Sequence, residues 1–151
     1  MTTPNSALRA RYLADSIATA SPAKLLVMLY DRLVQDLLRA EEALAAGDRG
    51  GASQQLSHAR DIVLELRASL DLEAWDGAAG LANLYVFLLT ELMQASVSVD
   101  AGRVAACRAL VEPLRDAWRE AAAATAATAA TAATAAATAP AAAAGSMSRI
   151  G

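Results

Sequence analysis

Apolar side chains recur every three or four residues in four successive stretches of this chain, and this periodicity limits the fold more than any other feature. The clearest stretch has its apolar residues at intervals of four, three, four, three and four: Ala52, Leu56, Ala59, Val63, Leu66 and Leu70. That interval matches the turn of an α-helix, and it lays one apolar stripe along each helix. No stretch alternates apolar and polar residues with the period of a β-strand. The sequence therefore predicts an all-α protein, an antiparallel four-helix bundle. Its core is expected to contain Leu29, Leu33, Leu56, Val63, Leu66, Leu88, Leu92, Leu114 and Trp118.

Capping and breaking residues bound the first two predicted helices. Ser21 directly precedes Pro22, which is the usual order of an N-cap and a first helical residue. Gly47 supplies a stop for this helix. A turn over 47–51 is expected next, because three of its five residues are glycine. The second helix is therefore expected to begin near Ala52.

Sequence breaks also bound the predicted third and fourth helices. A break over 72–80, with its turn at Asp76-Gly77, predicts a third helix from about residue 78 to 99, and the fourth is expected to begin near Asp100. Pro113 lies inside the fourth helix. Proline has no backbone N–H to donate to the carbonyl of Ala109, so a kink is expected there.

The two ends of the chain differ in composition from the predicted bundle, which spans 21–122. Residues 1–20 have little periodicity and are interpreted as a mobile arm. Residues 121–144 are alanine and threonine with a single proline. They include no Leu, Ile, Val or Phe, so membrane insertion is not expected. Residues 123–151 are interpreted as a tail that passes from frayed helix into disorder.

Charge and cysteine content exclude several classes of protein. The formal net charge is −3, from 13 basic and 16 acidic residues, and no basic stripe is present to neutralise phosphates. Nucleic acid is therefore not an expected partner. Cys107 is the single cysteine, so no internal disulfide forms. Residues 1–16 lack the apolar run of a secretory signal, and a cytoplasmic location is expected.

The sequence lacks the residue sets that catalysis or metal binding needs. His58 is the single histidine, so the paired histidines of di-iron bundles and the His–Cys sets of zinc sites cannot form. Cys107 falls on an apolar stripe, where a small core residue is expected. Gly50-Gly51 is not followed by the lysine of a phosphate-binding loop. We therefore expect no enzyme, no cofactor, no metal and no small-molecule substrate.

His58 still leaves one alternative function open, because a single histidine on a four-helix bundle is the arrangement of a histidine phosphotransfer domain. Such domains need a nearby cation to offset the charge of the phosphoryl group. Here Asp61 follows three residues later and Ile62 four residues later, while Arg60 lies on a different face. A plain surface histidine is the favoured interpretation.

The predicted third helix is apolar on more than one side, which is typical either of a central, buried helix or of one that also contacts a partner. Outside its bundle stripe lie Val86, Leu89, Met93 and Val97. A soluble monomer rarely leaves such a patch exposed without a use. We expect a client groove here, extended by Ile62 of the second helix, and a self-associating structural bundle is the other alternative.

Four motifs in the same order along about 110 residues resemble the flagellin export chaperones of the FliS family. The first set is Tyr12, Ile17, Thr19-Ala20-Ser21-Pro22, Leu25 and Met28-Leu29-Tyr30-Asp31. The other three sets are residues 59–66 with 69–71, residues 81–87 and residues 114–118.

The resemblance implies a chaperone that binds the disordered C-terminal segment of flagellin, prevents its premature polymerisation and assists its export for flagellum assembly. It further implies handover to the flagellar export apparatus, and an arm that covers part of the client site when no client is bound. Together with the apolar surplus, it predicts these partner-binding residues: Tyr12, Ile17, Ile62, Tyr85, Val86, Leu89 and Met93.

Overall fold

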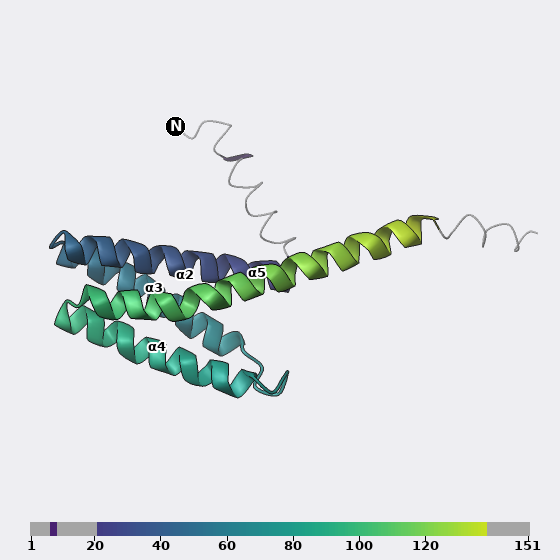
Figure 1. Ribbon diagram of the computed structural model, residues 1–151. Coiled ribbons are helices and arrows are strands. Elements are labelled where there is room, and N and C mark those ends of the chain that lie inside the picture. The colour runs from purple at the N-terminus through teal and green to yellow at the C-terminus, as the bar shows by residue number, and fades with distance from the viewer. Residues whose placement is uncertain (1–6, 9–20, 139–151) are drawn as a thin grey trace, which may run out of the picture.

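The computed structural model describes residues 7–8 and 21–138, and from residue 21 onward this part of the chain forms four α-helices without a strand. The helices are α2 (Pro22–Ala45), α3 (Arg49–Ser69), α4 (Ala78–Ser98) and α5 (Ala101–Thr138). Short turns join them, so each helix runs opposite to the one before it (Figure 1). The predicted all-α antiparallel bundle is confirmed.

The four helices surround one core, with α2 and α4 at diagonal positions. Helix α2 packs extensively on α3 and α5, whereas α4 packs on the same two helices through fewer contacts. Toward the end where α4 begins, α4 and α5 diverge (Figure 1). The bundle is therefore tighter around α2 than around α4.

Helix α2 begins and ends where its capping residues predict. The Ser21 hydroxyl accepts a hydrogen bond from the backbone N–H of Lys24 at 3.2 Å, and Pro22 occupies the first turn. Gly47 follows the helix with φ of 76°, a left-handed conformation that glycine adopts without steric cost.

The predicted start of the next helix, near Ala52, is wrong by about one turn, because α3 begins at Arg49. Asp48 caps it, accepting a hydrogen bond from the backbone N–H of Gly51 at 2.9 Å. Such a cap contributes about 1 kcal/mol, which offsets the low helix propensity of one glycine. Glycine at position 51 leaves room for this cap, since a Cβ there would clash with the carboxylate of Asp48.

Helix α5 continues beyond the predicted limit of the bundle at residue 122. It runs through Pro113 without interruption and reaches Thr138, although every side chain from 123 to 138 is exposed. Threonine hydroxyls along this extension donate to the carbonyl four residues earlier, for example from Thr125 to Ala121 at 3.0 Å. The rest of the predicted tail, 139–151, lies outside the described residues.

The core combines residues from all four helices and largely matches its prediction. Six predicted members are buried: Leu33, Leu56, Val63, Leu66, Leu88 and Leu92. The other three pack partly buried against them: Leu29, Leu114 and Trp118.

Among the described residues, α4 is the one helix whose length and apolar composition would allow it to cross a membrane. The core helices of soluble proteins pass the same test, and six apolar residues of α4 are buried in the bundle: Ala78, Leu81, Tyr85, Leu88, Leu92 and Ala95. The apolar side chains of α4 therefore form two groups, one that faces the core and one that faces outward.

Candidate partner-binding surface

Four apolar side chains of α4 are exposed, and together they define the α4 outer face. Val86 is 44%, Phe87 49%, Met93 54% and Val97 78% exposed. Met93 follows Val86 by seven residues and Val97 follows Met93 by four, so these three share the side of the helix opposite to the buried Leu88 and Leu92, and Phe87 lies beside them. Isolated exposed hydrophobic residues are common, but a row of them on one helix is typical of an interaction surface.

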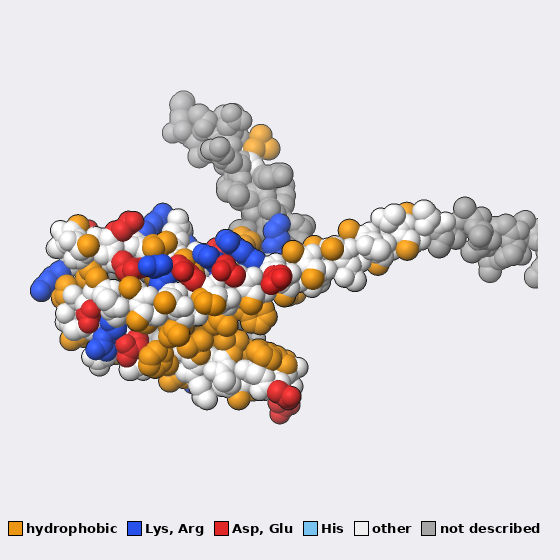
Figure 2. Space-filling view, in the orientation of Figure 1, with side chains coloured by type: hydrophobic (Ala, Val, Ile, Leu, Met, Phe, Trp, Pro, Cys, Tyr) orange, Lys and Arg blue, Asp and Glu red, His pale blue; other side chains and the backbone are white. Residues whose placement is uncertain are grey.

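A second apolar feature, the end pocket, lies where α2 begins, α3 ends and α4 begins. It has a volume of about 290 Å³, and its apolar lining comes from every helix of the bundle and from the loop before α4: Leu26, Leu66, Leu70, Trp75, Leu81, Tyr85 and Trp118. In Figure 2, hydrophobic side chains gather in the hollow between α5 and α4 on this side of the molecule. The α4 outer face and the end pocket thus share helix α4.

Two buried tyrosines cross the bundle beside the end pocket. The hydroxyl oxygens of Tyr30 on α2 and Tyr85 on α4 are 2.6 Å apart, and each residue is 2% exposed or less. Burial raises the pKa of Tyr85, and its hydrogen bond with Tyr30 raises it further. Burial likewise raises the pKa of Tyr30. Both hydroxyls are therefore neutral at physiological pH, and they link the diagonal pair of helices.

Trp118 completes this part of the core from α5. Its ring packs on that of Tyr30 with centroids 6.3 Å apart and planes tilted by 52°. The indole N–H is buried and makes no hydrogen bond within the described part of the chain. Such an unmet donor is uncommon in a folded protein.

The single histidine is held by a buried acid that sequence reasoning missed. Asp36 is completely buried, and it accepts a hydrogen bond from Nε of Arg32 at 3.0 Å while pairing with Nδ1 of His58. About half of the His58 side chain is exposed. The ring is thus fixed between α2 and α3, so the interpretation as a plain surface histidine is incomplete. The carboxylate beside it carries the wrong charge for a phosphoryl acceptor.

The Cys107 thiol is a further group that could carry chemistry, and it lies in the core. Burial raises the pKa of the Cys107 thiol to about 11, so this sulfur is a protonated part of the core at neutral pH. Within the described residues no cluster of three or more His, Cys, Asp and Glu side chains is arranged to hold a metal ion.

The residues predicted to bind a partner occupy three different environments. Val86 and Met93 belong to the exposed α4 outer face, and Leu89 beside them is partly buried against the core. Ile62 and Tyr85 are buried, although Tyr85 lines the end pocket. The other two, Tyr12 and Ile17, lie outside the described residues.

Two exposed aromatic residues were not among those predictions. Phe87 belongs to the α4 outer face, and Trp75 lines the end pocket from the loop before α4. Phe87 directly follows Val86 in an apolar run, and that position was the available signal. Trp75 lies in a loop without periodicity, and a large aromatic residue beside the Asp76-Gly77 turn was the available signal.

Comparison with known proteins gives a consistent family. The family described as "Flagellar protein FliS" matches residues 4–125. A protein of Bacillus subtilis (strain 168) named flagellar secretion chaperone FliS is 29% identical over 110 residues, covering 73% of this chain and 82% of the relative. A protein of the same name from Escherichia coli (strain K12) is 32% identical over 108 residues, covering 70% and 79%.

A solved structure supports the fold independently. The crystal structure of a flagellar chaperone from bacteria superposes with a TM-score of 0.63 at 22% identity, and the match covers 78% of this chain and 97% of that one. At this identity the likeness shows the helical arrangement alone. The family match extends over most of the chain, including all four predicted motifs. This chain belongs to the FliS family of flagellar secretion chaperones.

Proposed function

We propose that this protein is a cytoplasmic chaperone that binds the disordered C-terminal segment of flagellin and keeps it from polymerising before export. The observation that supports this proposal most directly is the exposed α4 outer face, which offers Val86, Phe87, Met93 and Val97 to a partner. An amphipathic segment that folds as a helix on such a face is a common mode of recognition. The chaperone then acts by stoichiometric binding, without turnover.

The energetics favour a client that contacts both apolar features. Fully burying one large apolar side chain contributes about 1.5–3 kcal/mol, so four that begin half exposed contribute roughly 3–6 kcal/mol in total. Ordering a disordered client costs about 2–5 kcal/mol or more. The contribution of the α4 outer face would then be nearly cancelled by the ordering cost. A second anchor in the end pocket supplies the surplus that stable binding needs.

The buried residues of the predicted site have a supporting role in this proposal. A client side chain in the end pocket would touch Tyr85, which forms part of its wall. Ile62 lies beneath the surface of α3 at 6% exposure, so it contributes through the shape of the groove floor.

The proposal extends to the arm and to export. Tyr12 and Ile17 are proposed to form a weak intramolecular lid over surface that the client later occupies. A lid lowers the apparent affinity only by the fraction of molecules that remain open. Release of the client at the flagellar export apparatus is the remaining step.

Charge substitution on the α4 outer face tests the proposal. Met93→Asp is expected to weaken the affinity for a flagellin C-terminal peptide at least tenfold, because an exposed methionine is replaced by a charge that the client must desolvate. Leu64→Asp is the matched control, since Leu64 is 50% exposed on α3. Met93 is preferred over Leu89 for this purpose, because Leu89 also packs on the core.

Isothermal titration calorimetry measures the affinity of each variant for the peptide, and circular dichroism shows whether the variant keeps its helices. The proposal requires that Met93→Asp loses affinity while keeping its helical spectrum, and that Leu64→Asp binds normally. Equal binding by the two variants would place the client elsewhere. Light scattering that shows a stable oligomer without client affinity would favour the self-associating bundle instead.

A further inference from the structure

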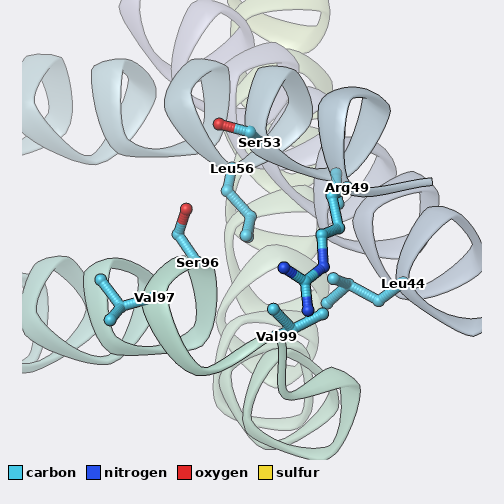
Figure 3. A pocket seen from close by; sticks show the side chains of 8 residues that line it. Leu44, Arg49, Ser53, Leu56, Ser96, Val97 and Val99 are labelled. Atoms are coloured by element: carbon cyan, nitrogen blue, oxygen red, sulfur yellow. The ribbon is translucent and has the colours of Figure 1, made fainter. Parts of the chain in front are cut away.

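A small pocket lies at the opposite end of the bundle, where α2 ends, α3 begins and α4 ends (Figure 3). Its volume is about 110 Å³, and its apolar lining includes Leu44, Leu56 and Val99. An enclosed, wholly apolar cavity of about 150 Å³ binds benzene, whereas this pocket is open to solvent and only partly apolar. This pocket is somewhat smaller, so it suits one branched aliphatic side chain.

Polar groups from two facing helices surround this apolar lining. Arg49 and Ser53 belong to α3, and Ser96 belongs to α4. The Arg49 guanidinium extends toward Val99 and lies beside Leu44 (Figure 3). Within the described part of the chain, these three side chains make no hydrogen bond to the protein, and Arg49 forms no ion pair there. The pocket therefore presents one uncompensated cation and two available hydroxyl groups.

Two acidic residues adjoin the pocket in sequence, Asp48 before Arg49 and Asp100 after Val99, and neither forms an ion pair with Arg49 within the described residues. Asp48 accepts a hydrogen bond from the backbone N–H of Gly51 and caps α3. Asp100 accepts one from the backbone N–H of Arg103 at 3.2 Å, at the start of α5. Each carboxylate thus caps a helix N-terminus, and the exposed Arg49 is available to a group from outside the chain.

The backbone at Val99 is an independent indication that this pocket has a use. Val99 has φ of 55° and ψ of 46°, in the left-handed region. β-Branched residues rarely adopt this conformation, and glycine is the usual residue after a helix that ends in this way. Strain of this kind is concentrated at functional sites. Glycine would relieve it, but it would also remove one wall of the pocket.

We propose that this pocket docks a segment of a partner protein in which an aliphatic side chain is adjacent to an acidic residue. The aliphatic side chain enters between Leu56 and Val99, and the carboxylate pairs with the guanidinium of Arg49. The hydroxyls of Ser53 and Ser96 then bind the backbone of the segment. This pocket shares no residue with the end pocket and lies at the other end of the bundle, although Val97 of the α4 outer face also lines it.

Titration of the full-length, ¹⁵N-labelled chain with two short peptides tests this proposal. Both peptides are acetylated and amidated hexapeptides; one contains adjacent leucine and aspartate, and the other has asparagine in place of aspartate. The first is expected to shift the backbone amide signals of Arg49, Ser96 and Val99 in a saturable way. An exposed ion pair contributes up to about 1 kcal/mol, so the asparagine peptide is expected to bind up to about fivefold more weakly.

Three variants complete the experiment. Arg49→Gln is expected to reduce the affinity for the aspartate peptide to that of the asparagine peptide, whereas Arg67→Gln, the same charge change on an exposed residue of α3, is expected to leave it unchanged. Val99→Gly is expected to keep or raise the thermal midpoint while weakening binding. The thermal measurement separates loss of the pocket wall from loss of the fold.

Several results would overturn the proposal. Equal affinity for the two peptides would show that the carboxylate is not recognised. The same shifts with sodium acetate alone would show that a free anion suffices. Self-association without peptide that Arg49→Gln abolishes would assign the pocket to a second copy of this chain. Because the flagellin peptide is expected to bind Arg49→Gln normally, this outcome and that of the proposed function are measured independently.

Discussion

Removing one hydroxyl from the buried Tyr30–Tyr85 pair is expected to cost nearly as much stability as removing both. The two hydroxyl oxygens are 2.6 Å apart, and neither ring is accessible to water. Tyr30→Phe or Tyr85→Phe leaves the other hydroxyl buried without a partner, which costs about 1–3 kcal/mol of unfolding free energy. The double variant leaves no hydroxyl unpaired. Its cost is therefore expected to be close to that of one single variant, well below the sum of the two.

Urea unfolding of the parent, both single variants and the double variant measures this coupling as a double-mutant cycle. The slope of free energy against urea should stay constant, so that the midpoints report stability alone. Costs that simply add would mean that the two hydroxyls act independently, and the inferred coupling between Tyr30 and Tyr85 would be refuted.

The same pair predicts a loss of stability at alkaline pH. A tyrosine in the unfolded chain ionises near pH 10, whereas burial raises the pKa of Tyr30 and Tyr85 in the folded state. The unfolded state therefore loses its protons first. The stabilisation is complete below about pH 10 and falls above it by about 1.4 kcal/mol per pH unit for each tyrosine. Urea midpoints between pH 8 and 11 should show a shallower fall for the double phenylalanine variant.

Two further predictions rest on burial and exposure, and a third rests on the proposed lid. Leu88→Ala, at a core position that is 1% exposed, should lower the unfolding free energy by about 2–5 kcal/mol, and a loss below about 1 kcal/mol in urea unfolding would show that the site is misassigned. Deletion of 123–151 should leave the thermal midpoint and the flagellin affinity nearly unchanged, since every described side chain of that segment is exposed; a tenfold weaker affinity would contradict this. Deletion of 1–16 should raise the association rate for a flagellin peptide, and weaker binding without that gain would exclude the lid.

Sequence periodicity is sufficient for the helices and most of the core because both depend on local, repeating physics. The stripe from Leu56 to Leu66 predicts one buried face, and Ser21-Pro22 predicts a helix start that the hydrogen bond to Lys24 confirms. The predicted start of α3 is wrong because two glycines favour a turn where Asp48 instead caps a helix. In the structure, α3 begins at Arg49, directly after the Asp48 cap.

The candidate site could be predicted only in part, because exposure depends on how the helices diverge. Val86 and Met93 are exposed as expected, while Ile62 is covered by packing that no periodicity reveals. The burial of Asp36 was missed for a similar reason. A single carboxylate on an apolar face can be interpreted from sequence only when its partner is known, and His58 comes from another helix.

The extension of α5 also changes how the size of this protein will appear in solution. The sixteen exposed residues from 123 to 138 are helical, and at 1.5 Å per residue they project about 24 Å from the bundle. A projecting rod raises the Stokes radius without adding a second chain. A monomer of 15.5 kDa would therefore elute early in gel filtration and resemble a dimer of a globular protein. Sedimentation equilibrium or multi-angle light scattering, which report mass, would return one chain, and the 123–151 deletion would shift the elution volume far more than its mass implies.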